Sequence, residues 1–93
     1  MANIKLKIIT PSNILYDADN IHMITAPGYE GEFGILPGHI PLLISLKTGY
    51  IKVYNQKEEI IKKFPIATGI CQVKEDLCTI FIEKTKDKKP PSP

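Results

Sequence analysis

The sequence predicts an all-β protein, an antiparallel β-sandwich or flattened barrel of about nine to ten short strands. Three observations support this fold class. Apolar and polar residues alternate with a period of two along much of the chain, turn-forming residues recur roughly every 8–12 residues, and no long segment has a helical pattern. The 93 residues suffice for one domain, and a hydrophobic fraction of 43% is typical of a folded globule.

The expected strands follow one another with short turns between them. In the first segment, NIKLKIIT, the side chains of Ile4, Leu6 and Ile8 share one face and lysines occupy the other. Turns are indicated where proline, glycine or asparagine interrupts the alternation, because these residues adopt turn conformations readily. The expected strands cover residues 3–10, 14–19, 20–26, 31–36, 41–46, 49–55, 58–64, 65–73 and 76–83.

A helix competes with a strand only in EEIIKKF, residues 58–64, and there Pro65 would end it after two turns. The last two strands are separated by Lys74 and Glu75, which suggests a hairpin.

The end of the chain, KDKKPPSP, is charged and then rich in proline, so it continues neither a helix nor a strand. We therefore expect one domain over residues 3–85 and a disordered tail over residues 86–93.

The charge and the termini argue against several classes of protein. The formal net charge is only +2, and every basic side chain is lysine, whereas arginine is the usual residue for contacts with bases and phosphates. A nucleic-acid partner is therefore not expected. The N-terminus lacks the apolar centre of a secretory signal, and no apolar run approaches the roughly 20 residues of a membrane helix. We expect a protein that stays in the compartment where it is made.

The two cysteines, Cys71 and Cys78, are too few for a disulfide framework, and their spacing matches no zinc motif. We expect two small buried thiols. They would face each other if the hairpin turns at Lys74 and Glu75, and a shift of one residue in register would separate them.

The stretch GYEGEFGILPGHIPLL, residues 28–43, holds four of the six glycines of the chain. As a catalytic site it would pair His39 with Glu30 or Glu32, but no nucleophile or metal ligand set accompanies them. The other histidine, His22, is expected to be an ordinary strand residue. As a phosphate loop the stretch lacks the Lys-Ser/Thr ending, and its carboxylates would repel the ligand.

A docking surface explains this stretch better. Glycine permits positive φ and close approach of the backbone, and prolines stiffen the chain around it. The stretch would then present carboxylates and an imidazole on a rigid polar loop between two apolar strands, as a polar interface requires.

The same residues carry a family resemblance. EGEFGILPGHIPLL, followed by LKTGYIKV, resembles the signature of the epsilon subunit of F-type ATP synthase, whose mitochondrial counterpart is called delta. The opening IKLKIITPSNILYDADNIHMITAPG is similar to the first strands of that family, and IATGICQVKEDLCTIFIEK is similar to its final strand pair. The resemblance covers roughly residues 3–85.

This resemblance implies a β-sandwich in the rotating central stalk, bound to the gamma subunit and resting on the polar loops of the c-ring. It implies a non-catalytic subunit, without cofactor or metal, that couples proton translocation to ATP synthesis. The implied location is peripheral, at the cytoplasmic face of the bacterial plasma membrane, and no homo-oligomer is expected. The implied c-ring-facing loop consists of Glu30, Gly31, Glu32 and His39, and its core support consists of Leu42, Leu43 and Ile44.

The chain departs from longer members of the family, which continue into a pair of C-terminal helices that inhibit ATP hydrolysis and in some cases bind ATP. Here KDKKPPSP stands at that place, so those roles are not implied, and a naturally short form is expected rather than a cut chain.

Two other classes stay open from the sequence. One is a free-standing β-sandwich that binds a small ligand or a peptide, which would need a concave pocket or an open edge strand. The other is a small esterase or isomerase, which would rest on His39 alone.

Overall fold

The computed structural model describes residues 3–38 and 41–84, and within these residues every regular element is a strand. The number of strands agrees with the sequence-based prediction. No helix in the described residues is long and apolar enough to cross a membrane. The strands are β1 (Ile4–Ile9), β2 (Ile14–Ile21), β3 (Met23–Gly28), β4 (Gly31–Ile35), β5 (Leu42–Leu46), β6 (Gly49–Tyr54), β7 (Ile60–Ile66), β8 (Thr68–Lys74) and β9 (Leu77–Lys84).

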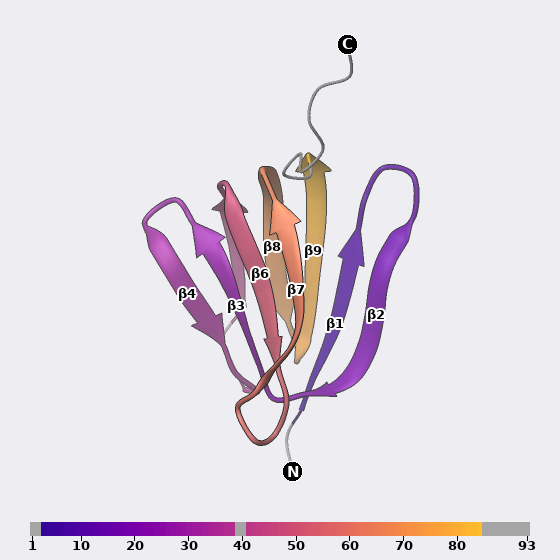
Figure 1. Ribbon diagram of the computed structural model, residues 1–93, viewed down its shortest axis with the longest axis vertical. Helices are drawn as coiled ribbons and strands as arrows, with labels where there is room; N and C mark the ends of the chain where they lie inside the picture. Colours follow the sequence, from indigo (N-terminus) through magenta and orange to yellow (C-terminus); the bar gives the residue numbers. More distant parts are fainter. Residues whose placement is uncertain (1–2, 39–40, 85–93) are drawn as a thin grey trace.

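The strands form one sheet in the order β2-β1-β9-β8-β5-β3-β6-β7, with β4 paired to β3. The sheet curls on itself, so that β6 and β7 lie in front of β8 and β9 (Figure 1). One half of the sheet contains β2, β1, β9, β8 and β5, and the other contains β3, β4, β6 and β7. The two halves join where Gly28 of β3 opposes Leu46 of β5. The predicted sandwich of short strands is confirmed, and its pairs are antiparallel except for β1 with β9. This parallel pair joins the first and last strands, for which no local pattern in the sequence gives a signal.

Apolar side chains from both halves of the sheet fill the interior. The predicted alternation in β1 is confirmed, because Ile4, Leu6 and Ile8 are buried and Lys5 is exposed. Among the described residues no polar or charged residue is buried. The core consists of Ile4, Leu6, Ile8, Ile21, Ile24, Ala26, Ile35, Leu46, Ile51, Val53, Ile66, Cys71, Val73, Cys78, Ile80 and Ile82.

The two end strands of the sheet, β2 and β7, meet through side chains. The rings of Tyr16 and Phe64 lie 5.1 Å apart, centroid to centroid, at an angle of 57°. Pro65 lies within β7, opposite Tyr50, although the sequence placed it at the start of the following strand. Proline is tolerated there because β7 is paired on one side only in the order of the sheet, so one row of backbone donors is not needed for pairing.

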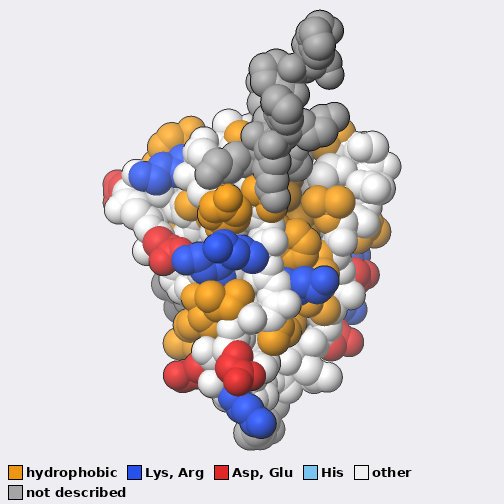
Figure 2. Space-filling model, in the orientation of Figure 1, with side chains coloured by type: hydrophobic (Ala, Val, Ile, Leu, Met, Phe, Trp, Pro, Cys, Tyr) orange, Lys and Arg blue, Asp and Glu red, His pale blue; other side chains and the backbone are white. Residues whose placement is uncertain are grey.

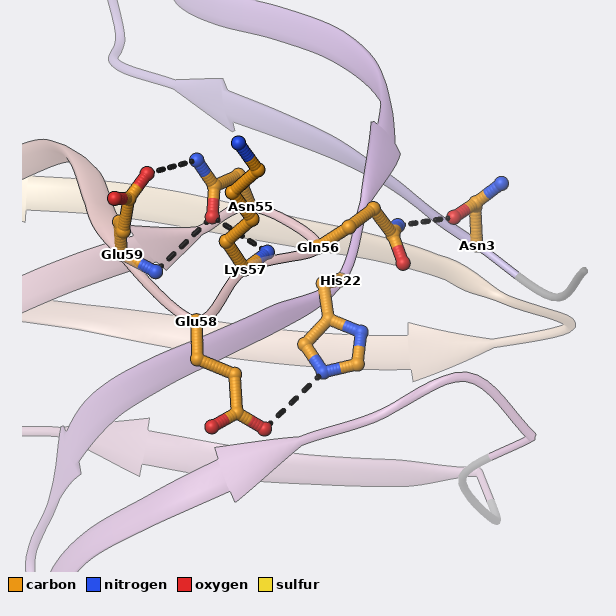
Figure 3. A network of polar contacts seen from close by, with 7 residues as sticks. All are labelled: Asn3, His22, Asn55, Gln56, Lys57, Glu58 and Glu59. Atoms are coloured by element: carbon orange, nitrogen blue, oxygen red, sulfur yellow. Dashed lines mark hydrogen bonds and ion pairs between the residues drawn. The ribbon is translucent and has the colours of Figure 1, made fainter.

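The junction between β2 and β3 lies where the sequence predicted a continuous third strand. Asn20 has a φ of 60°, a conformation that asparagine tolerates better than most residues, and β3 begins only at Met23. His22 lies between the two strands, and its Nε2 is 3.9 Å from a carboxylate oxygen of Glu58 in the loop after β6 (Figure 3).

That loop is fixed by its own amide side chains. The Oδ1 atom of Asn55 accepts hydrogen bonds from the backbone N–H groups of Lys57, at 2.9 Å, and Glu59, at 3.0 Å. The Nε2 atom of Gln56 donates to Oδ1 of Asn3 at 2.8 Å, which ties the loop to the chain just before β1 (Figure 3). These contacts turn the chain between strands, and the turn predicted near residues 55–57 is confirmed.

Candidate docking surfaces

The β3–β4 turn presents the first part of the glycine stretch to solvent. Gly31 has a φ of 127°, which strongly favours glycine, and pairs with Gly28 across the turn. Tyr29, at the tip, has 64% of its surface exposed, and Glu30 and Glu32 are also exposed. The sequence-predicted residues Glu30, Gly31 and Glu32 are therefore adjacent at the β3–β4 hairpin, where Glu30 lies in the turn and Gly31 and Glu32 begin β4.

A shallow cavity of about 450 Å³ lies beside this turn. Its walls come from the turn and from the neighbouring strand β5, and they consist of Gly28, Tyr29, Glu30, Gly31, Glu32, Phe33, Ile44 and Ser45. Lys52 Nζ lies 3.5 Å from Glu32 Oε2, so one of the two carboxylates at the cavity has a cationic neighbour. The other carboxylate, that of Glu30, lies at the cavity beside apolar walls from Phe33 and Ile44.

The face formed by β3, β4, β6 and β7 mixes lysine and acidic side chains with hydrophobic ones (Figure 2). Lys52 and Lys63 stand directly opposite each other on β6 and β7. Lys63 Nζ lies 4.7 Å from the centroid of the Tyr50 ring, and Lys52 approaches Glu32. These separate contacts reduce the repulsion between the two ammonium groups.

The second part of the glycine stretch lies at the other end of β4. Glu30 lies just before the start of β4, and Gly38 lies after the end of β4. Five strand residues separate the two ends by roughly 16 Å. Glu30 and Gly38 therefore lie at opposite ends of a strand, in agreement with the strand expected over residues 31–36. His39 lies outside the described residues.

The expected core support, Leu42, Leu43 and Ile44, is only partly correct. Leu42 and Ile44 are half-buried and pack against the core. Leu43 is 69% exposed, so its assignment to the core is wrong. Successive strand residues point to opposite faces, and three adjacent residues of β5 therefore cannot all be inside.

Leu43 belongs instead to an apolar surface that the sequence analysis missed. Ile70 of β8 and Leu77 and Phe81 of β9 are also exposed, and in the sheet β8 lies between β5 and β9. We call Leu43, Ile70, Leu77 and Phe81 the outer apolar face. In the register of the sheet Ile70 opposes Phe81, and Phe81 in turn opposes Ile9 of β1.

A signal for this face was present in the sequence. The segment DLCTIFIE carries apolar residues at both odd and even positions, so that apolar side chains must point to both faces of the strand. The inward set contains Cys78, Ile80 and Ile82, and the outward set contains Leu77 and Phe81. A strand that is apolar on both faces is typical of one that is covered on both sides.

The two cysteines are part of the core, as expected. Their Sγ atoms lie 3.7 Å apart and both thiols are free. They are diagonal rather than opposite, because Cys71 pairs with Ile80 and Cys78 with Val73. The hydrogen bond with Cys71, followed by burial, raises the pKa of Cys78 well above its usual range, so this thiol stays protonated. A reactive or metal-binding role therefore has no support.

Both the sequence and the fold of this chain match a known protein family. Residues 3–87 match the family model for the ATP synthase delta/epsilon chain, β-sandwich domain. The ATP synthase epsilon chain of Rickettsia bellii is 44% identical over 81 residues, which are 86% of this chain and 74% of the relative. The epsilon chain of Staphylococcus aureus is 32% identical over 84 residues, which are 89% of this chain and 60% of the relative.

Two solved structures share the fold. A chain of the Euglena gracilis mitochondrial ATP synthase, in a structure of OSCP, F1 and the c-ring, has a TM-score of 0.80 at 22% identity, with 92% of this chain and 54% of that chain covered. A chain in the central stalk and c-ring structure of Tetrahymena thermophila mitochondrial ATP synthase has a TM-score of 0.71 at 22% identity, with 90% and 66% covered. This chain thus spans little more than half of the Euglena chain. With its β-sandwich and the family match over residues 3–87, the chain belongs to the ATP synthase delta/epsilon family.

Proposed function

We propose that this protein is a non-catalytic central-stalk subunit of an F-type ATP synthase, which couples proton translocation through the c-ring to ATP synthesis. The observation that carries the proposal is the family match over residues 3–87, and two candidate docking surfaces, a polar hairpin and a face with exposed apolar residues, support it. A rotor subunit transmits torque, and a curled sheet whose strands are hydrogen-bonded in series deforms little under load.

The β3–β4 turn is the proposed contact with the c-ring. Its two exposed carboxylates, Glu30 and Glu32, and the cavity beside them suit polar or cationic loops. Individual surface ion pairs contribute about 0–1 kcal/mol, so such a contact sets register and orientation more than affinity. The glycine conformation at Gly31 keeps the turn tight, and we propose that His39 also belongs to the c-ring contact.

The outer apolar face is the proposed contact with the gamma subunit. Ile70 and Phe81 oppose each other on β8 and β9, whereas Leu43 opposes Gln72 and Leu77 opposes Lys74, so the exposed apolar side chains of this face stand among polar ones. Leu43, Ile70, Leu77 and Phe81 offer no chemistry of their own, and burying them against a partner removes apolar area from water. This surface is proposed to supply the affinity that the polar turn lacks.

The proposal also covers the bounds of the domain and the location of the subunit. The folded domain is proposed to end near residue 85, and residues 86–93 to form a tail. The subunit is proposed to sit at the cytoplasmic face of the bacterial plasma membrane, held there through the complex.

The double substitution Glu30→Ala/Glu32→Ala tests the polar contact. We expect it to lower the rate of ATP synthesis at a given proton gradient in reconstituted vesicles, while the thermal unfolding midpoint of the isolated chain changes little, because both side chains are exposed. Glu58→Ala is the matched control, since this carboxylate is also exposed but belongs to the β6–β7 loop at the other end of the molecule. Unchanged coupling in the double variant would contradict the assignment of the turn.

A further inference from the structure

Strand β4 is an open edge of the sheet. It pairs with β3 on one side, and among the described residues no strand pairs with its other side. In Figure 1 it is the outermost strand on the side away from β1 and β2. Edge strands expose backbone N–H and C=O groups that can pair with another chain, and proteins usually protect them with lysine, proline or a bulge. Residues 31–35, GEFGI, contain no lysine or proline, and their register with β3 has no bulge.

The backbone groups that point to this edge belong to Glu32 and Gly34. Pro27 opposes Glu32, and because proline has no N–H, these two residues cannot form a hydrogen-bonded pair. The carbonyl oxygen of Pro27 instead accepts a hydrogen bond from the N–H of Lys47, between β5 and β6, at 2.9 Å. Hydrogen-bonded and non-hydrogen-bonded pairs alternate along an antiparallel ladder, so Thr25 and Gly34 also form a non-hydrogen-bonded pair. The N–H and C=O groups of Glu32 and Gly34 therefore point away from β3.

The side chains of this edge leave its backbone accessible. Gly34 is exposed, and a Cβ atom built on it would meet only Sδ of Met23, at 3.8 Å. The carboxylate of Glu32 is the one charge on β4, and it lies 3.5 Å from Nζ of Lys52 on β6. This charge is therefore directed toward the neighbouring strands of the sheet and partly neutralised, so it gives the open edge little protection.

The cavity of about 450 Å³ lies beside the same edge. Its walls include Phe33 of β4 and Ile44 of β5. Strand β5 pairs with β8 along its length but with β3 only at Leu46, so residues 42–45 are also paired on one side only. A strand added to β4 would therefore lie next to a cavity with apolar walls and with the carboxylate of Glu30 among its lining groups.

We propose that the outer edge of β4 is a strand-addition site, at which an extended segment of a partner polypeptide forms backbone hydrogen bonds with Glu32 and Gly34. The segment places an apolar side chain against Phe33 and Ile44 in the cavity. A basic side chain of the segment reaches the carboxylate of Glu30, which forms no ion pair within the described part of the chain.

The partner segment is held in place by the complex to which it belongs. Two N–H and two C=O groups support only weak binding on their own, and linkage to an assembled complex raises the effective concentration of the segment. The inference rests on the proposed function in one respect, because it takes that complex to be an ATP synthase. It differs from the proposed c-ring contact in using the backbone of β4 rather than the carboxylates of the turn.

Hydrogen exchange measures strand addition directly, because it reports on single backbone N–H groups. The full-length chain is compared free in solution and bound to ATP synthase purified without this chain. In the free chain the amides of Phe33 and Ile35, which bond to β3, should exchange slowly. The amides of Glu32 and Gly34 should exchange fast in the free chain and about tenfold more slowly or less in the complex, because new backbone hydrogen bonds protect them.

Gly34→Pro and Gly34→Ala form a matched pair of variants. Proline removes the outward N–H of residue 34 and breaks no hydrogen bond with β3, and edge strands tolerate proline at such a position. Alanine keeps that N–H and adds a side chain with room around it. Both variants should keep the circular dichroism spectrum of the wild type. The affinity of Gly34→Pro for the depleted synthase should be about tenfold lower than that of Gly34→Ala, or lower still.

Three results would overturn the inference while leaving the proposed function intact. One is unchanged exchange of Glu32 and Gly34 in the bound chain, and another is equal affinity of the two folded variants. The third is protection of the same two amides in a dimer of the isolated chain, which would assign the edge to a second copy. If Gly34→Pro does not fold, the exchange measurement on the wild type decides alone. Failure of the wild-type chain to bind the depleted synthase would overturn the proposed function and the inference together.

Discussion

Leu46→Ala is expected to lower the free energy of unfolding by about 2–5 kcal/mol, whereas Leu43→Ala should change it by no more than about 0.5 kcal/mol. The two leucines lie three positions apart on β5, and they therefore point to opposite faces of the sheet. Leu46 is 1% exposed and part of the core, while Leu43 is 69% exposed. Truncating the buried leucine leaves a cavity between the two halves of the sheet, and truncating the exposed one does not.

The pair is a matched experiment, because the substitution and the strand are the same in both variants. Urea denaturation followed by circular dichroism gives both free energies, provided that the slopes against urea are equal. Leu43→Ala should instead weaken association with a partner on the outer apolar face. Equal losses of stability in the two variants would show that Leu43 is inside and that this face is misassigned.

The second large effect is expected for Gly69→Ala. A Cβ atom at Gly69 would lie 2.5 Å from the carbonyl oxygen of Phe81 and 2.8 Å from Cδ1 of Ile66. The first contact is with backbone on the paired strand β9, next to an irregularity in the β8–β9 register, so relief requires the two strands to move apart. Such overpacking costs about 1–3 kcal/mol or more.

Gly34→Ala is the control for Gly69→Ala. A Cβ atom at Gly34 would meet only Sδ of Met23, at 3.8 Å, which is an ordinary contact. We expect its stability to be unchanged or raised by about 0.4–1 kcal/mol, because alanine restricts the unfolded chain. Thermal unfolding of both variants measures the difference. A Gly69→Ala variant as stable as Gly34→Ala would mean that β8 and β9 are not packed as closely as the structure shows.

The alternation of apolar and polar residues, together with the turn-forming residues between segments, was enough to predict the strands. Alternation identified β1 and its buried face, and turn-forming residues separated β5 from β6. Pairing between distant segments had no such signal, which is why the parallel pair of β1 with β9 was not expected. The placement of Pro65 within β7 likewise depends on β7 being the last strand of the sheet, a fact of topology rather than of local sequence.

The candidate site was predicted only where it is local in sequence. Glu30, Gly31 and Glu32 are consecutive, and the structure keeps them at one hairpin, Glu30 in the turn and the other two at the start of β4. The Pro37-Gly38 corner is close to them in sequence but is separated by the length of β4. The outer apolar face draws on three strands, and only its part on β9 has a signal in the sequence, namely the apolar residues at both odd and even positions of DLCTIFIE. Leu43 was placed inside because an apolar run was interpreted as core, although a strand divides such a run between two faces.

In the proposed function one sandwich engages two different partners through two different surfaces. The most direct measurement places a photo-crosslinking amino acid at Glu30 and, in a separate variant, at Phe81, within the assembled ATP synthase, with a third variant at Glu58 as control. We expect position 30 to crosslink to the c subunit, position 81 to crosslink to the gamma subunit, and position 58 to crosslink to neither. Recovery of position 81 without gamma, or of position 30 without the c subunit, would contradict it.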